Sequence, residues 1–172
     1  MNLHFQNLIP VNFNNQSKVW IYQSNRPFVV NEATAVNEML HEFTANWKSH
    51  GAPVKAFAKL FFNQFIVLMA DETVTHVGGC STDSSVRVIK TIEQQLNVQL
   101  FDRQTLAFVL DNEIELVPLS QLINAVQIEK LNGDTLYFNN TVLTKEQLLN
   151  EWIIPARLSW LAKSVNFTTL VA

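Results

Sequence analysis

The amino-acid sequence predicts an α+β fold, a mostly antiparallel sheet with helices, in one domain that covers residues 1–172. Strand-like and helix-like segments alternate between residues 18 and 117 in the order of a ferredoxin-like β-α-β-β-α-β start. A C-terminal hairpin and helices follow it. The composition is 48% hydrophobic with twelve Phe and four Trp, enough for a dense core. We find no repeat and no Gly/Ser-rich or Pro-rich linker that would divide the chain.

The first predicted strand is Lys18–Gln23, because Val19 to Tyr22 are β-branched or aromatic. Residues 1–16, which precede it, show no steady period and are either an arm packed on the body or a disordered lead-in. A helix is then expected from the N-cap Asn31 to a stop at residues 49–53, where Gly51 can take a left-handed cap. Four side chains at helical spacing give its buried face: Val36, Leu40, Phe43 and Trp47.

Two strands, residues 56–62 and 65–70, are expected to form a hairpin that turns at Asn63-Gln64. The second strand is apolar on both faces, which favours a central position in the sheet. A second helix is expected to begin near Ser81 or Asp83 and to end at Asn97, with caps provided by hydroxyl and carboxylate groups.

The C-terminal half is predicted to hold a hairpin of residues 106–110 and 114–117, a short helix, and a third strand pair of residues 136–138 and 142–143. The short helix should face inward through four side chains: Leu119, Leu122, Ile123 and Val126. Thr144 to Gln147 read as a capping box that starts another helix. The last stretch, residues 158–172, holds Trp160 and Phe167 and is expected to dock on the body.

The formal net charge of −3, with 12 scattered Lys and Arg, argues against nucleic-acid binding, which relies on phosphate neutralisation. The sequence has no basic cluster that would bind a membrane surface and no apolar run long enough to span a bilayer, so it argues against a membrane role. One cysteine and an N-terminus without a signal peptide predict a cytoplasmic protein.

The sequence predicts that the chain is organised around residues 77–85, a stretch of small residues that leads into the second helix. Cys80 lies where a helix dipole would favour a thiolate, so His76 or His50 could pair with it and Asp83 could orient the imidazole. These are the weak catalytic candidates. The alternative is that Cys80 is a small apolar side chain in a tight turn, and this alternative has the greater weight.

The same stretch could bind an anion or a small polar ligand, because a helix start offers free N–H groups. The candidate ligand residues are Gly79, Cys80, Ser81 and Asp83, with Arg26 as a neighbour. No phosphate-binding fingerprint supports this site, and the hydroxyls can equally serve as helix caps. We predict no metal site and no cofactor, because the four His show no ligand spacing and Glu113 and Glu115 fit a solvated hairpin face.

Several stretches together resemble one family of small proteins from Bacteroidetes. They are Val19 to Pro27, Ser49 to Pro53, Phe65 to Leu68, Gly79 to Val86, Leu100 to Arg103, Phe138 to Asn140 and Trp152 to Trp160. Members are often labelled "ABC transporter ATPase". The resemblance implies an intracellular bacterial protein and brings no functional residues with it. The label conflicts with this sequence, which lacks the Lys-bearing phosphate loop that such an ATPase requires.

The sequence therefore favours a non-catalytic binding or assembly module, whose partner is a second copy, another protein or a small polar ligand. The alternative is a thiol-dependent enzyme that uses Cys80. The four Trp are expected to be core or docking residues, and any exposed C-terminal Trp and Leu would mark a partner surface.

Overall fold

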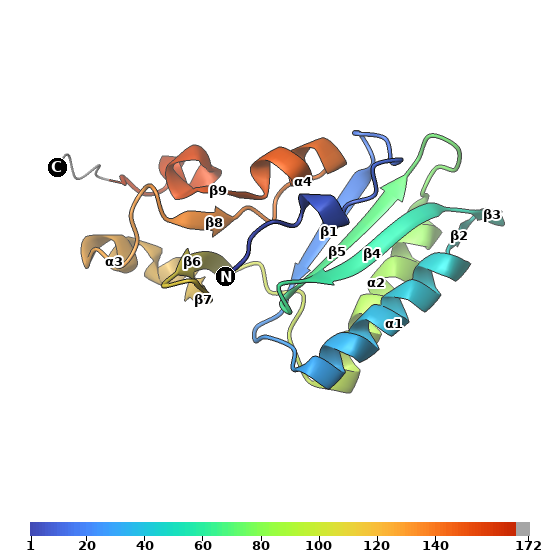
Figure 1. The fold of residues 1–172 in the computed structure, drawn as a ribbon, viewed down its shortest axis with the longest axis horizontal. Helices are drawn as coiled ribbons and strands as arrows, with labels where there is room; N and C mark the ends of the chain where they lie inside the picture. The colour runs from blue at the N-terminus through green and yellow to red at the C-terminus, as the bar shows by residue number, and fades with distance from the viewer. Residues whose placement is uncertain (168–172) are drawn as a thin grey trace. The chain divides into compact units, whose positions relative to one another are not determined.

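The computed structural model describes residues 1–167 and confirms the α+β class, with helices and antiparallel sheets. The chain forms two compact units (Figure 1). The larger unit holds residues 4–101 and 142–149, and the smaller unit holds residues 1–3, 102–141 and 150–167. That the two behave as one domain stays a prediction.

The larger unit is built on a three-stranded sheet in the order β1-β5-β4, with both neighbouring pairs antiparallel. Its elements, in chain order, are η1 (Gln6–Leu8), β1 (Lys18–Gln23), α1 (Val30–Asn46), β2 (Lys48–Ser49), β3 (Ala52–Pro53), β4 (Lys55–Phe61), β5 (Phe65–Asp71) and α2 (Gly79–Leu96). β5 lies in the centre and is buried along its whole length, as its apolar pattern predicted. The order of these three strands is that of a split β-α-β unit.

The ferredoxin-like plan is not completed. The strand predicted to be its fourth, β6 (Thr105–Leu110), lies in the smaller unit, where β7 (Glu113–Pro118) and β8 (Leu136–Phe138) occupy its two edges. Pairing of this kind is decided between distant segments, and the local apolar pattern does not report it.

The helices α1 and α2 cover the same face of the sheet (Figure 1). Leu40 from α1 and Ile89 and Ile92 from α2 are fully buried against Ile66 of β5. Each such side chain contributes about 1.5–3 kcal/mol before entropy is counted. The helical stripe read from the sequence therefore does build the core.

The opposite face of the sheet is covered by the N-terminal arm and by residues 142–149. Phe5 packs edge-on against Phe61, with ring centroids 6.2 Å apart. The buried Lys145 donates from Nζ to the carbonyl of Phe13 at 2.7 Å. The arm is thus packed on the body, the first of the two alternatives.

The ends of α1 differ from the prediction. Val29 is the N-cap instead of Asn31, because the Glu32 carboxylate accepts from the Val29 amide at 3.0 Å. The helix ends at Asn46, and the stop predicted at residues 49–53 is the small hairpin β2–β3, which turns at His50 and Gly51 with positive φ.

The β4–β5 hairpin turns one residue earlier than predicted. Phe62 and Asn63 both have left-handed φ, and the Gln64 amide donates to the carbonyl of Phe61 at 3.0 Å. The side-chain amide of Gln64 donates to the backbone carbonyl of Ser24, and the backbone carbonyl of Gln64 accepts from the Ser24 amide. That partner keeps Gln64 buried and out of the turn.

The smaller unit holds a four-stranded sheet in the order β7-β6-β8-β9. Its remaining elements are η2 (Leu119–Gln121), α3 (Leu122–Gln127), β9 (Ile153–Pro155), η3 (Ala156–Leu158) and η4 (Trp160–Lys163). The β6–β7 hairpin turns at Asp111-Asn112 as predicted, with positive φ at both residues. In the short helix Leu122 and Ala125 are buried whereas Ile123 is exposed, so the predicted inward position of Ile123 is wrong.

The third predicted strand pair is also wrong, because β8 pairs with β6 and β9. Residues 142–143 instead continue into Thr144, which bridges to Lys18 of β1 in the larger unit. The helix predicted after them is α4 (Lys145–Glu151), and the Thr144 hydroxyl caps it by accepting from the Gln147 amide at 3.2 Å.

The last stretch docks within the smaller unit through Leu161 and Val165, which are buried in its core beside Phe167. Residues 168–172 of this predicted segment lie outside the described part of the chain. Within residues 1–167, no helix combines the length and the apolar character that crossing a bilayer requires.

Candidate functional site

The stretch singled out from the sequence forms the start of α2. Gly78 is an extended N-cap (φ −82°, ψ 179°), and the helix begins at Gly79, so residues 79–85 are helical. The predicted side-chain caps are wrong, because Gly78 has no side chain and Thr82, Ser84 and Ser85 donate their hydroxyls to carbonyls three or four residues earlier. These hydroxyls are therefore occupied within the helix.

His50 and the segment before α2 do lie together. The Ser49 hydroxyl donates to the carbonyl of His76 at 2.6 Å and accepts from the Gly78 amide at 3.4 Å. A Cβ at Gly78 would stand 3.1 Å from Nε2 of His50, so the imidazole packs over this glycine. The absence of a side chain at position 78 is what permits that contact.

The catalytic group proposed around Cys80 is not assembled. Cys80 is exposed, and its thiol forms no hydrogen bond with any described residue. His76 turns to Glu72 instead, with Nδ1 3.1 Å from the carboxylate, and Asp83 is exposed without a hydrogen-bonded imidazole. Of the proposed catalytic group, the structure shows only an exposed thiol in the first turn of α2.

Arg26 lies at the other end of α2. Its guanidinium binds the Glu32 carboxylate through two hydrogen bonds of 2.7 and 2.9 Å and donates to the carbonyl of Leu96, the last residue of the helix, at 2.9 Å. The hydrogen bond from Arg26 and that from the Val29 amide lower the pKa of Glu32 to about 2. Arg26 is a structural clamp, and its predicted place beside Gly79 to Asp83 is wrong.

Two further acidic residues, Asp71 of the larger unit and Glu115 of the smaller unit, form ion pairs with lysines. Burial raises the pKa of Asp71, but hydrogen bonds from Lys55, Thr73 and the Asn14 amide outweigh it and hold that pKa well below its usual range. Glu115 of the smaller unit pairs with Lys130. Among residues 1–167 no three His, Cys, Asp or Glu side chains are close enough to hold a metal ion.

A first groove, of about 660 Å³, lies between α1 and α2. Its floor is apolar and includes Phe43 and Trp47, whose ring centroids are 5.0 Å apart. Trp47 is buried and donates from Nε1 to the carbonyl of Ser81 at 3.0 Å, which fixes the start of α2 against the end of α1. Trp47 is thus a core residue, as expected.

The other predicted docking residues divide in the same way. Trp152 is fully buried, whereas Leu158 and Trp160 of the smaller unit remain exposed at 62% and 38%. Trp160 donates a hydrogen bond from its Nε1 to the hydroxyl of Tyr137 at 3.3 Å. Two side chains expose less apolar area than interaction patches usually do.

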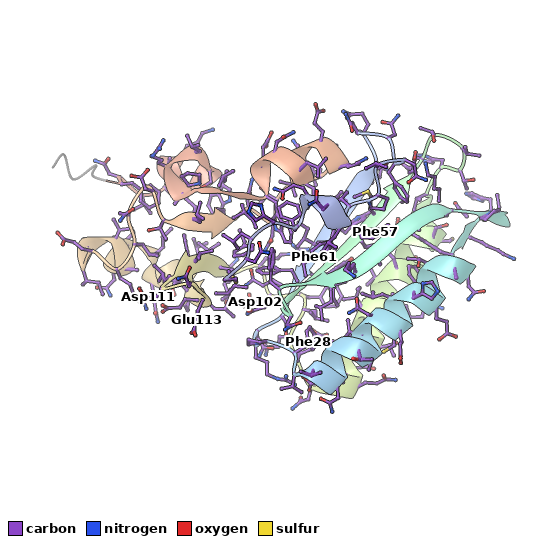
Figure 2. All side chains as sticks on the ribbon, viewed as in Figure 1. Phe28, Phe57, Phe61, Asp102, Asp111 and Glu113 are labelled. Atoms are coloured by element: carbon purple, nitrogen blue, oxygen red, sulfur yellow. The ribbon has the colours of Figure 1, made fainter. Side chains whose placement is uncertain are left out.

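A second groove, of about 820 Å³, runs between α1 and the free edge of β4. From α1 it is lined by Thr34, Asn37, Glu38, His41, Thr44 and Ala45, and from β4 by Ala56, Phe57, Ala58 and Lys59. The alanines of β4 leave this space open because a larger side chain would extend toward α1. Figure 2 labels Phe57, which lies on the same strand as Phe61.

The backbone of β4 is open at this edge. The Leu60 amide donates to Oδ1 of Asn37 at 3.1 Å and therefore points away from β5. Because amide direction alternates along a strand, the backbone groups of Ala58 and Ala56 point the same way. No described residue hydrogen-bonds these outward groups of Ala56 and Ala58.

Sequence reasoning placed the strand but missed this site. The only local signal is the segment Lys55-Ala56-Phe57-Ala58-Lys59, where small residues alternate with large ones on a strand that carries two lysines. Lysines are typical of exposed strand edges. Whether another segment covers the outer side of β4 depends on pairing between distant residues, which the local pattern does not report.

Comparison of the chain with protein-family models, with curated proteins and with solved structures found no match.

Proposed function

We propose that this protein is a non-catalytic binding or assembly module that acts in the bacterial cytoplasm. The observation that carries the proposal is the open edge of β4 beside a groove of about 820 Å³. An exposed strand edge with unpaired N–H and C=O groups is a template for another chain. When a flanking groove accepts the side chains of that chain, the arrangement is the one used in β-strand addition.

The polar groups near the start of α2 also support binding over catalysis. The hydroxyls of Thr82, Ser84 and Ser85 are bonded within the helix, and neither His50 nor His76 is hydrogen-bonded to Cys80. A general base has to lie within hydrogen-bond reach of the proton that it removes. The exposed free thiol of Cys80 suits a reducing compartment.

The experiment is a selection of displayed random ten-residue peptides on the immobilised full-length protein, followed by binding measurements with synthetic copies of the selected peptides. We expect reproducible binders that also bind the Cys80→Ser variant with unchanged affinity. Sedimentation velocity over a hundredfold range of concentration examines assembly in parallel. A protein that enriches no peptide and stays monomeric throughout would contradict the proposal.

A thiol-dependent enzyme is the second candidate, and the observation in its favour is the exposure of Cys80 in the first turn of α2. A helix start favours the thiolate form. The rate of alkylation by iodoacetamide decides between the two. An unactivated thiol loses about tenfold in rate for each unit of pH below about 8, whereas an activated thiol keeps its rate down to pH 6.

A further inference from the structure

We propose that the edge of β4 takes an extended peptide of a partner protein, with an acidic side chain opposite Lys59. This inference rests on the proposed binding function and names its partner. A strand added to β4 would lie about 4.8 Å away and form hydrogen bonds to the outward groups of Ala56 and Ala58. Its side chains opposite these two alanines would enter the groove beside α1.

Lys59 gives the edge its charge preference. It is half-buried and has no ion pair with any described residue, whereas the other lysine of the strand, Lys55, is paired with Asp71 at 2.8 Å. Opposite charges that face each other across two strands attract, and like charges repel. An acidic residue in the added strand therefore fits the position opposite Lys59.

A second copy of the chain fits this edge less well. Paired antiparallel around Phe57, two β4 strands would place Lys55 of each copy directly opposite Lys59 of the other. Paired around Ala58, they would place the two Lys59 side chains on a diagonal about 7–8 Å apart. This second register also needs the Leu60 amide as a donor, but that amide already donates to Oδ1 of Asn37. In neither of these two registers does an acidic side chain lie opposite Lys59, so a peptide with a negative charge is the better occupant.

The strand direction sets the order of residues in that peptide. In an antiparallel addition, the residue opposite Lys59 comes two positions before the residue opposite Phe57. The side chains of Lys59 and Phe57 share the face of the sheet that lies away from α1, because alternate residues of a strand point the same way. The expected pattern is therefore an Asp or Glu, any residue, then an apolar residue.

The test uses the peptides selected on the full-length protein. We expect them to share the acidic-x-apolar pattern and to lose about fivefold in affinity or more with Lys59→Glu, because an attraction becomes a repulsion. Lys90→Glu is the matched control, since Lys90 is an exposed lysine on α2 without an ion pair to a described residue, and it should leave the affinity unchanged. Selection on Lys59→Glu should favour Lys or Arg at the same position.

Ala58→Pro removes one outward amide without removing a bond to β5, and it should weaken binding about tenfold or more. Should this variant fail to fold, the charge reversal at Lys59 decides alone. An acidic preference that persists on Lys59→Glu, or peptides without that preference, would overturn this inference and leave the binding function standing. Self-association of the wild type that Ala58→Pro abolishes would point to a second copy as the occupant and overturn it too.

Discussion

The two edges of the sheet in the larger unit are treated differently by the chain. At β1, the Val19 amide donates to the carbonyl of Leu143 at 2.9 Å, and Thr144 bridges to Lys18. At β4, the only described partner of the outward groups is the side-chain oxygen of Asn37. Among the described residues, a distant segment covers the edge at β1, whereas the edge at β4 is left open to another chain.

The largest effect that we predict separates the two edges with proline. Val19→Pro removes a backbone hydrogen bond at the covered edge and should cost about 3 kcal/mol or more of unfolding free energy, whereas Ala58→Pro at the open edge should cost less than about 1 kcal/mol. Urea melts monitored by circular dichroism measure both variants.

Val19→Ala is the control that isolates the packing lost with the side chain, because Val19 is buried. If the two proline variants were equally destabilised, the contrast between the edges would be lost.

The second prediction concerns the segment that covers β1. Lys145 is buried, and its Nζ donates to the carbonyls of Phe13 at 2.7 Å and Val11 at 3.3 Å. Lys145→Met keeps the side-chain stem but leaves both carbonyls without this donor, so we expect a loss of about 1.5–3 kcal/mol. Lys163→Met, at an exposed position, should change the unfolding free energy by less than about 0.5 kcal/mol in the same melts.

A Lys145→Met variant as stable as the wild type would mean that the arm and residues 142–149 do not hold each other at this edge.

How far the sequence predicts this contrast depends on the range of the interactions. The strand Lys18–Gln23 was predicted with its observed bounds, because Val19 to Tyr22 carry the signal themselves. The end of α2 was predicted too, since Asn97 takes the left-handed φ that ends a helix there. By contrast, the pairing of Leu143 and Thr144 with β1 depends on residues far away in the chain.

The candidate site shows the same limit. A helix start near Ser81 could be read locally, but a run of hydroxyls does not reveal whether they cap the helix or bond within it. Arg26 was placed at the wrong end of α2, because the contact with Leu96 joins segments that no sequence pattern connects. The open backbone groups of Ala56 and Ala58 on β4 were out of reach for the same reason.

The third prediction uses pH to examine the bond between the arm and the sheet. Asp71 accepts from Lys55 Nζ at 2.8 Å and from the Asn14 amide at 3.1 Å, and its pKa lies below the ordinary value despite its burial. A carboxyl group with a lowered pKa in the folded state stabilises the fold above its unfolded value of about 3.9, and this contribution is lost as the pH falls through the folded pKa.

Asp71→Asn should therefore cost about 1.5–3 kcal/mol at pH 7 and progressively less below about pH 4. Unfolding free energies from urea melts at several pH values give the profile. Asp83→Asn is the control, because Asp83 is exposed on α2. In this variant the unfolding free energy should change with pH as it does in the wild type. A constant difference between Asp71→Asn and the wild type from pH 7 to pH 3 would show that the charge of Asp71 is not what matters.

The smallest effect concerns the one side chain that partly closes the open edge. Asn37 accepts from the Leu60 amide through Oδ1 and donates from Nδ2 to the carbonyl of Ala33 at 2.9 Å. In Asn37→Ala water can reach the freed amide, so the unfolding free energy should change by about 0.5–1 kcal/mol at most. The variant also adds a third outward amide to those of Ala56 and Ala58, which should strengthen the binding of the selected peptides about two- to fivefold. Urea melts and peptide titrations measure the two effects. Lost stability beyond about 2 kcal/mol would show instead that Asn37 holds β4 against α1, and the open edge would then be a consequence of that contact.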